Sequence, residues 1–387
     1  MLREVRIPKL EFYILLVFLV LELVFNYTAQ FSLYGANALF SRYAIVYMAA
    51  FVYNIYIYIV YSGKVIFQKG VGKKILPAIL FFTYAATFSS DLVDIIWHYV
   101  SYLLFFVNIF ALTLNAKNNK VVRETISILW YLGVFSFFVI RSGLGRNESI
   151  TGPTYLILLL FPIFYGMNRF VLIFRTIILV FVLVISGKRG PILAFAVAYV
   201  ISYMANSIFN NRERSNLVKI AFTLGAMALM FFAVFNVSGG TLLNRFSDVR
   251  DDGGSGRDVI SEAVWYSYIT SDSKEKIWGH GFNGVIEDNI YNGISAHNDY
   301  LEVLYDYGIV GVVLFMLMTL NILFLGVSSL KRASPNSTAF LFFFICTLFI
   351  CLVSHIVIYP TNYFELLTVY SILLSKEFQW RNHYVQL

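Results

Sequence analysis

Long apolar segments recur along the whole chain and are separated by short polar stretches. Most approach the length of about 20 residues that a helix needs to cross a bilayer. We therefore expect about twelve membrane-spanning helices, at approximately 11–29, 43–61, 75–89, 93–114, 124–140, 152–167, 170–186, 191–209, 217–237, 301–326, 338–358 and 363–375. One long polar segment, 238–299, lies between the ninth and tenth of these spans. The pattern predicts an all-α polytopic membrane protein, with residues 1–387 as a single transmembrane domain.

Composition supports this class, because 59% of the residues are hydrophobic, only 13% are charged, and the mean hydropathy is +0.72. A soluble domain is usually about one quarter charged. The net charge of +7 would suit a nucleic-acid partner, but Lys and Arg gather in alternate loops, as the positive-inside rule requires. With the N-terminus inside, the cytoplasmic loops hold Lys64, Lys69, Lys73, Lys74, Lys117, Lys120, Arg123, Arg169, Arg212, Arg214, Lys219, Lys331 and Arg332. We therefore expect both termini in the cytoplasm, the 238–299 loop outside, and no nucleic-acid partner.

A smaller set of basic residues falls on the outer side, against this bias. Its members are Arg141, Arg146, Lys188, Arg189, Arg245, Arg250 and Arg257. The long loop itself contains more acidic than basic residues, whereas a surface for lipid headgroups would be broadly basic. These arginines therefore indicate specific anion contacts or internal ion pairs. Within the loop, 255–268 has helical signals, with Ser255 or Gly256 as cap and an apolar stripe formed by Ile260, Ala263, Val264 and Tyr268.

His297 lies where the polar loop meets the next apolar helix, with Asn298 or Asp299 as the expected helix cap. An imidazole has a pKa suited to a general base near neutral pH. A histidine that only caps the helix would show the same pattern, so both interpretations stay open. Glu302 and Asp306 follow in the first turns of that helix, where acids most often interact with the helix dipole.

The turn Ser186-Gly-Lys-Arg-Gly-Pro191 joins two spans on the outer side. A helix N-terminus favours anions through its free N–H groups, and the planar fork of Arg189 can pair with phosphate bidentately. Lys188 adds a second cation. The alternative is a connecting turn whose cations contact lipid headgroups.

Arg257 and Arg245 could face the same anion or form ion pairs with acids of their own loop, and Arg141 and Arg146 are weaker candidates. The histidines are scattered and no compact acidic cluster accompanies them, so we expect no metal site. A glycine loop of the kind that binds nucleotides is also absent from the sequence, and we expect no cofactor.

These segments together resemble the superfamily of O-antigen polymerases and O-antigen ligases, which are bacterial envelope glycan enzymes. The matching pieces are Ser186-Gly-Lys-Arg-Gly190, Ser255-Gly-Arg257 with Trp265, Gly279-His-Gly281, and His297-Asn-Asp-Tyr-Leu-Glu302 with Gly308 and Gly311. The resemblance covers about 185 to 315 specifically and departs at Lys188, where many relatives have a small or polar residue.

The resemblance implies a metal-independent, inverting glycosyltransferase of the GT-C type, with undecaprenyl-diphosphate-linked glycan as donor and acceptor. It implies that Arg189 and Arg257 bind the diphosphate and that His297 acts at the acceptor hydroxyl. Further substrate contacts are expected from Lys188, Arg245, Arg141, Arg146, Asn298, Tyr300 and Glu302.

We expect a polymerase in the bacterial inner membrane, with its site facing the periplasm and in contact with membrane lipid. The resemblance leaves open a partner protein that regulates chain length. The nearest alternative is a ligase that transfers finished glycan to lipid A–core, and ligases form the smaller branch of the resemblance. A secondary transporter is the alternative from another class, but transporters usually place charges mid-membrane, and here the candidates gather outside the spans.

Overall fold

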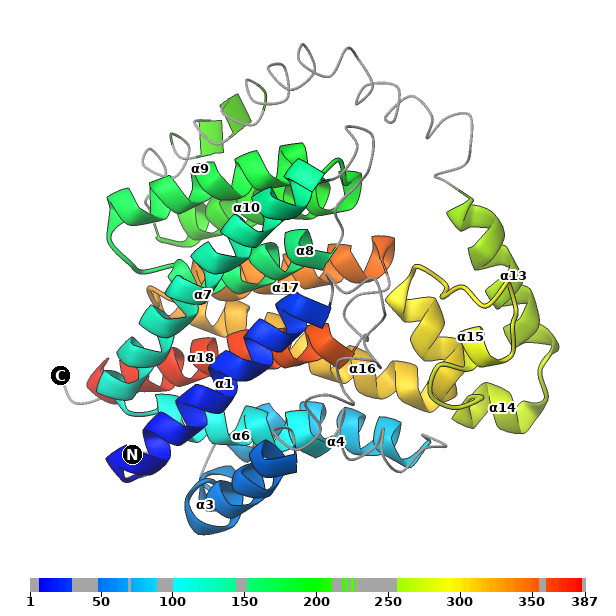
Figure 1. Ribbon diagram of the computed structural model, residues 1–387, viewed down its shortest axis with the longest axis horizontal. Coiled ribbons are helices and arrows are strands. Elements are labelled where there is room, and N and C mark those ends of the chain that lie inside the picture. The colour runs from blue at the N-terminus through cyan, green and yellow to red at the C-terminus, as the bar shows by residue number, and fades with distance from the viewer. Residues whose placement is uncertain are drawn as a thin grey trace.

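The computed structural model describes residues 7–29, 48–68, 71–88, 100–143, 152–210, 256–354 and 360–384, together with single positions between 218 and 228. Within these ranges all regular structure is helical (Figure 1). The predicted all-α class is therefore confirmed for the described part of the chain. Arg146, Arg245 and most of the predicted span 217–237 lie outside it.

The first half of the chain contains α1 (Lys9–Ala29), a helical segment Met48–Ile66 that includes η1 (Tyr58–Ser62) and α3 (Gly63–Ile66), α4 (Gly72–Thr87), α6 (Ser101–Thr113), α7 (Ala116–Gly143), α8 (Gly152–Leu160) and η3 (Phe161–Phe164). The second half contains α9 (Arg169–Ile185), α10 (Arg189–Asn210), α13 (Arg257–Thr270), α14 (Ser273–Trp278), α15 (Gly284–Glu287), α16 (Asp299–Lys331), α17 (Ser337–Val353) and α18 (Pro360–Tyr384).

Within the described residues, 4 helices are long and apolar enough to cross a membrane: Met48–Ile66, Ala116–Gly143, Arg189–Phe209 and Asp299–Lys331. They support a polytopic membrane protein. The described apolar helices Leu103–Thr113, Pro153–Phe164 and Ser337–Val353 are shorter. The twelve predicted spans thus stay a prediction, although each predicted range outside 217–237 overlaps an observed helix.

One continuous apolar core holds the bundle together. α16 packs against α4, α10 and α17, while α18 packs against α6 and α8. Aromatic rings fill the centre: Phe161 lies 6.0 Å from Phe195 and 5.7 Å from Phe342, measured between ring centroids. Edge and tilted ring contacts of this kind stabilise a core beyond the area that they bury.

The three loop helices α13, α14 and α15 lie together at one end of the bundle, to the right in Figure 1. We call this the loop end. α1 begins and α18 ends at the opposite side, which we call the terminal end (Figure 1). A second, smaller core at the loop end joins Ile260, Val264 and Tyr268 of α13 to Val285 and Tyr305. The helix predicted over 255–268 is therefore present as α13, and Gly256 is its N-cap.

Candidate functional site

Gly308 interrupts α16 with a kink. Residues 277–281 of the long loop pack against the backbone of α16 at this kink. The Gly308 φ of 63° and ψ of −167° are non-helical, a conformation that glycine adopts far more readily than other residues. On the N-terminal side of this kink, the carbonyl of Tyr305 accepts a hydrogen bond from the backbone N–H of His280 at 3.1 Å. The carbonyl of Asp306 accepts one from Gly281 at 2.8 Å. The kink therefore fixes the Gly279-His-Gly281 turn against α16.

His280 has a structural role in this docking. Its ring stacks on Tyr305 with centroids 4.0 Å apart and an interplanar angle of 4°. Its Nε2 lies 2.9 Å from the hydroxyl of Ser271, and its Nδ1 lies 3.3 Å from a carboxylate oxygen of Asp288. The Tyr305 hydroxyl donates to the same carboxylate at 2.8 Å. Both nitrogens of this histidine are thus engaged within the loop.

The segment that carries His297 is anchored on both sides. Before it, the backbone N–H of Ala296 donates to the buried carboxylate of Glu302 at 2.6 Å. After it, Asn298 is the N-cap of α16, and its side-chain oxygen accepts two backbone N–H groups of the first turn at 3.0 and 3.3 Å. His297 itself has a φ of 52°, which costs a non-glycine residue about 1–3 kcal/mol. The two anchors hold the imidazole in this conformation.

The surroundings of His297 favour its neutral form. The side chain is half-buried, and burial is the largest cause that lowers its pKa below the ordinary value of 6.5. The positive charges of Arg257 and Lys188 lower this pKa further. Two of the predicted cations, from α13 and from the turn before α10, are therefore close enough to act on the predicted base.

Arg257 begins α13 and ties it to the end of α17. Its guanidinium donates a hydrogen bond to the carbonyl of Val353. A Cβ added at Gly190 would lie 2.9 Å from a methyl group of Val353 and 3.2 Å from the hydroxyl of Tyr155. The first turn of α10, which starts with Arg189, thus packs against the residue that Arg257 contacts. α8, α10, α13 and α17 meet at this point.

Asp299 is a polar residue at this meeting point that the sequence suggested only as a helix cap. Asn298 takes the capping role, and Asp299 is fully buried at the first position of α16. It interacts electrostatically with Tyr155, and its carboxylate is hydrogen-bonded to the thiol of Cys351. The sequence does contain a signal for this role: Asn298 and Asp299 are adjacent and both can cap a helix. Only one of them can be the cap, so the other can make a different contact.

Three further residues with predicted substrate contacts are Tyr300, Glu302 and Arg141. Tyr300 is half-buried with its ring 5.7 Å from Phe315, and its hydroxyl has no hydrogen-bond partner among the described residues. Glu302 holds the backbone of Ala296, as described above. Arg141 lies in the last turn of α7. The substrate contacts of all three stay predictions.

The part of the chain that contains Lys188, Arg257 and His297 is similar to a known protein family. Residues 174–316 match the Wzy_C family model, described as O-Antigen ligase. The match supports the superfamily of O-antigen ligases and polymerases. It extends from α9 into α16 and includes Lys188, Arg189, Arg257 and His297. It does not distinguish an O-antigen ligase from an O-antigen polymerase. No curated protein matches the chain.

A metal site requires a particular arrangement of ligating side chains. Across the ranges that the structure covers, no group of three or more His, Cys, Asp or Glu side chains is arranged to hold a metal ion. Anion binding by Lys188, Arg189 and Arg257 stays a prediction. Arginine is apt for this role because its guanidinium stays charged and can pair bidentately with phosphate.

Proposed function

We propose that the chain is a membrane glycosyltransferase that polymerises lipid-diphosphate-linked oligosaccharide repeat units. The observation that carries the proposal is the placement of Arg257 and Lys188 beside a half-buried His297, within the segment that matches the family model. A base beside a seat for an anion is the arrangement that glycosyl transfer from a lipid diphosphate requires.

In the proposed reaction an acceptor hydroxyl attacks the anomeric carbon of the donor sugar. The bond between this carbon and the diphosphate oxygen breaks, and undecaprenyl diphosphate leaves with the bonding electron pair. Negative charge on the leaving group grows in the transition state, so fixed guanidinium groups of Arg257 and Arg189 stabilise it selectively. Lys188 adds to the same positive field.

The hydroxyl that attacks must lose its proton, and neutral His297 accepts it. The lowered pKa keeps the imidazole unprotonated at neutral pH. One direct displacement inverts the anomeric configuration and requires no covalent nucleophile on the protein. Glu302 and Asn298 act as positioning residues because they anchor the backbone on either side of His297.

The test is an assay of the purified protein with a defined undecaprenyl-diphosphate oligosaccharide, without an ion gradient. We expect longer lipid-linked glycans from the wild type and none from His297→Ala at equal protein level. A wild-type rate from His297→Ala would exclude the base assignment. No product from the wild type with any lipid-diphosphate glycan would argue against glycosyl transfer and leave a transporter as the better explanation.

A ligase is the second candidate function, because the matching family model carries the description O-Antigen ligase and the match does not distinguish the two activities. Polymerase and ligase would share the donor seat and differ in the acceptor. Lipopolysaccharide from a deletion strain separates the two activities. Core carrying single repeat units indicates a missing polymerase, whereas bare core with accumulated lipid-linked polymer indicates a missing ligase. We place the enzyme in the bacterial inner membrane with this site on the periplasmic side.

A further inference from the structure

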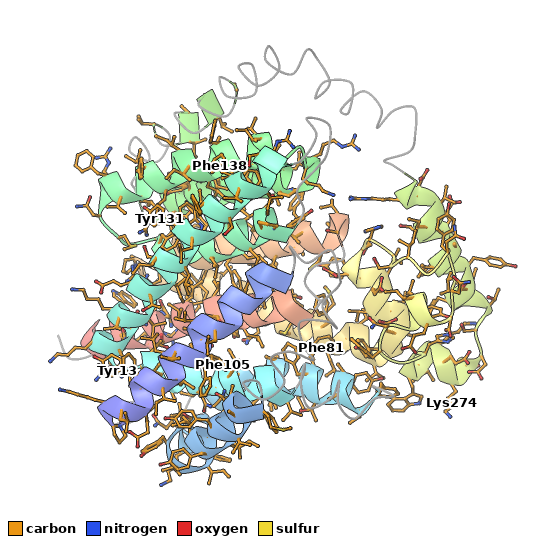
Figure 2. The ribbon with its side chains drawn as sticks, viewed as in Figure 1. Tyr13, Phe81, Phe105, Tyr131, Phe138 and Lys274 are labelled. Atoms are coloured by element: carbon orange, nitrogen blue, oxygen red, sulfur yellow. The ribbon has the colours of Figure 1, made fainter. Side chains whose placement is uncertain are left out.

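A buried arginine lies at the terminal end of the bundle. Its hydrogen-bond partners among the described residues are all neutral. Arg175 of α9 is 4% exposed. Its guanidinium donates to the hydroxyls of Tyr131 (3.1 Å) and Ser127, and to the sulfur of Met167 (3.0 Å). It also lies 4.1 Å from the ring centroid of Phe164. Figure 2 labels Tyr131 on α7, which supplies two of these partners. An arginine stays protonated in proteins, so a full positive charge is buried here.

Two more cations come from neighbouring helices. Arg123 of α7 interacts electrostatically with both Arg175 and Lys376, so the three charges share one region. Lys376 of α18 donates to the backbone carbonyl of Tyr165 at 2.9 Å. The Nε of Arg123 is buried and has no hydrogen-bond partner in the described part of the chain. That N–H group is therefore a donor that no described residue uses.

The described acids beside this cluster are engaged with other cations. Glu124 follows Arg123 and attracts it, but its side chain is 57% exposed and lies 3.8 Å from Lys120. Glu377 follows Lys376 on α18 and accepts from Arg332 at 3.3 Å and from Arg381 at 3.2 Å. Within the described residues, the cluster of Arg123, Arg175 and Lys376 therefore has a positive charge without a dedicated counter-charge.

We propose that Arg123, Arg175 and Lys376 form a binding site for a phosphate-bearing anion at the terminal end of the bundle. Burying like charges together is costly, and an anion between them offsets that cost. Arginine favours phosphate because its fork can donate two parallel hydrogen bonds. Arg123 lies near the start of α7, a helix long and apolar enough to cross a membrane, and lipid headgroups are located near the ends of such helices. The ligand is the phosphate of an anionic lipid headgroup or a free inorganic phosphate.

Basic residues near membrane surfaces usually extend into the headgroup region as single exposed side chains. Lys120 of α7 has this behaviour, because its side chain is 76% exposed. Arg175 does not, since Ser127 and Tyr131 hold its guanidinium inside the bundle. This contrast within a few turns distinguishes a built site from a general basic surface, and it does not depend on the chemistry proposed at the loop end.

The test measures thermal unfolding of the purified full chain in neutral detergent. Phosphatidylglycerol is compared with phosphatidylcholine, and inorganic phosphate with chloride at equal ionic strength. We expect a rise of a few degrees in the unfolding temperature with phosphatidylglycerol if the ligand is a lipid, and with inorganic phosphate if it is a free anion. Arg123→Gln should remove at least half of that rise, whereas Lys120→Gln, a change of equal charge on the same helix, should keep it.

Arg123→Lys keeps the charge and loses the fork, and it should give an intermediate rise. It also serves if Arg123→Gln does not fold. Native mass spectrometry of the wild type with equal amounts of the two lipids provides a measurement that needs no variant. The proposal is overturned if neither phosphatidylglycerol nor inorganic phosphate stabilises the wild type, or if the rise is the same in all three variants.

Discussion

Arg257 donates a hydrogen bond to the carbonyl of Val353 and thereby joins the first residue of α13 to the last residue of α17. The contact is to a backbone oxygen, so it holds the loop helix and does not neutralise the guanidinium. The same positive charge acts on His297. One side chain therefore links the position of the long loop to the electrostatics of the proposed base.

Arg257→Ala should lower the rate of glycan transfer by about 100-fold or more, because it removes a charge that we propose stabilises the leaving diphosphate. The matched control is Lys274→Ala, which removes the same charge from the same loop. Lys274 is exposed and labelled on α14 in Figure 2. The rate is measured with purified protein and a lipid-diphosphate donor. Equal losses in the two variants would show a general field effect and would contradict a specific role of Arg257.

Arg189→Lys should restore little of the activity that Arg189→Ala loses. A lysine keeps the charge but presents a point donor, and it cannot pair bidentately with a diphosphate. We expect the transfer rate of Arg189→Lys to be roughly tenfold or more below the wild-type rate. Arg169→Lys is the control, because Arg169 is the exposed first residue of α9, and it should be active. A fully active Arg189→Lys would remove the bidentate contact from the mechanism.

Much of this architecture follows from local pattern. The predicted span 191–209 falls on α10 (Arg189–Asn210), and the N-cap of α13 is Gly256, one of the two caps that the loop sequence allowed. Apolar run length and capping chemistry are local properties, so the sequence reveals them directly.

Other features depend on partners far along the chain. The apolar pattern after Tyr300 predicts one helix, whereas the structure has a kink at Gly308 because the 279–281 turn docks there. Asp299 looks like a cap in the sequence and is a buried contact of Cys351 in the fold. Such pairings between distant segments leave no periodic signal in a single sequence.

Lys188→Gln should move the acid limb of the pH–rate profile to higher pH. The pKa of His297 lies below 6.5, so the base stays neutral to a lower pH than a free imidazole, and activity falls as pH decreases through that lowered value. Removing the Lys188 charge raises this pKa toward 6.5, but the shift is partial because burial, the largest cause, remains. Lys274→Gln should leave the limb in place. An unchanged limb in Lys188→Gln would contradict the electrostatic contact.

Glu302→Gln should lower kcat by about tenfold and leave KM nearly unchanged. The carboxylate fixes the backbone of Ala296, and a weaker acceptor lets the imidazole of His297 leave its reactive orientation. Glu287→Gln is the control, because Glu287 is an exposed residue of α15. This variant should keep the wild-type kcat. A variant with raised KM and unaltered kcat would instead indicate that Glu302 contacts substrate, as the sequence suggested.

Gly308→Ala should destabilise the fold and loosen the loop from α16. The φ of 63° disfavours alanine, and an added Cβ would collide with the carbonyl of Ile277 and lie 2.7 Å from the backbone nitrogen of Gly279. The backbone on that side cannot move aside without breaking the docked turn. We therefore expect the free energy of unfolding to fall by about 2 kcal/mol or more. Gly143→Ala is the control, because a Cβ there would meet nothing within 4 Å. The unfolding temperature in detergent is measured for both, together with proteolysis of the loop. If Gly308→Ala unfolds at the wild-type temperature and its loop is equally protected, the kink is not what holds the 279–281 turn against α16.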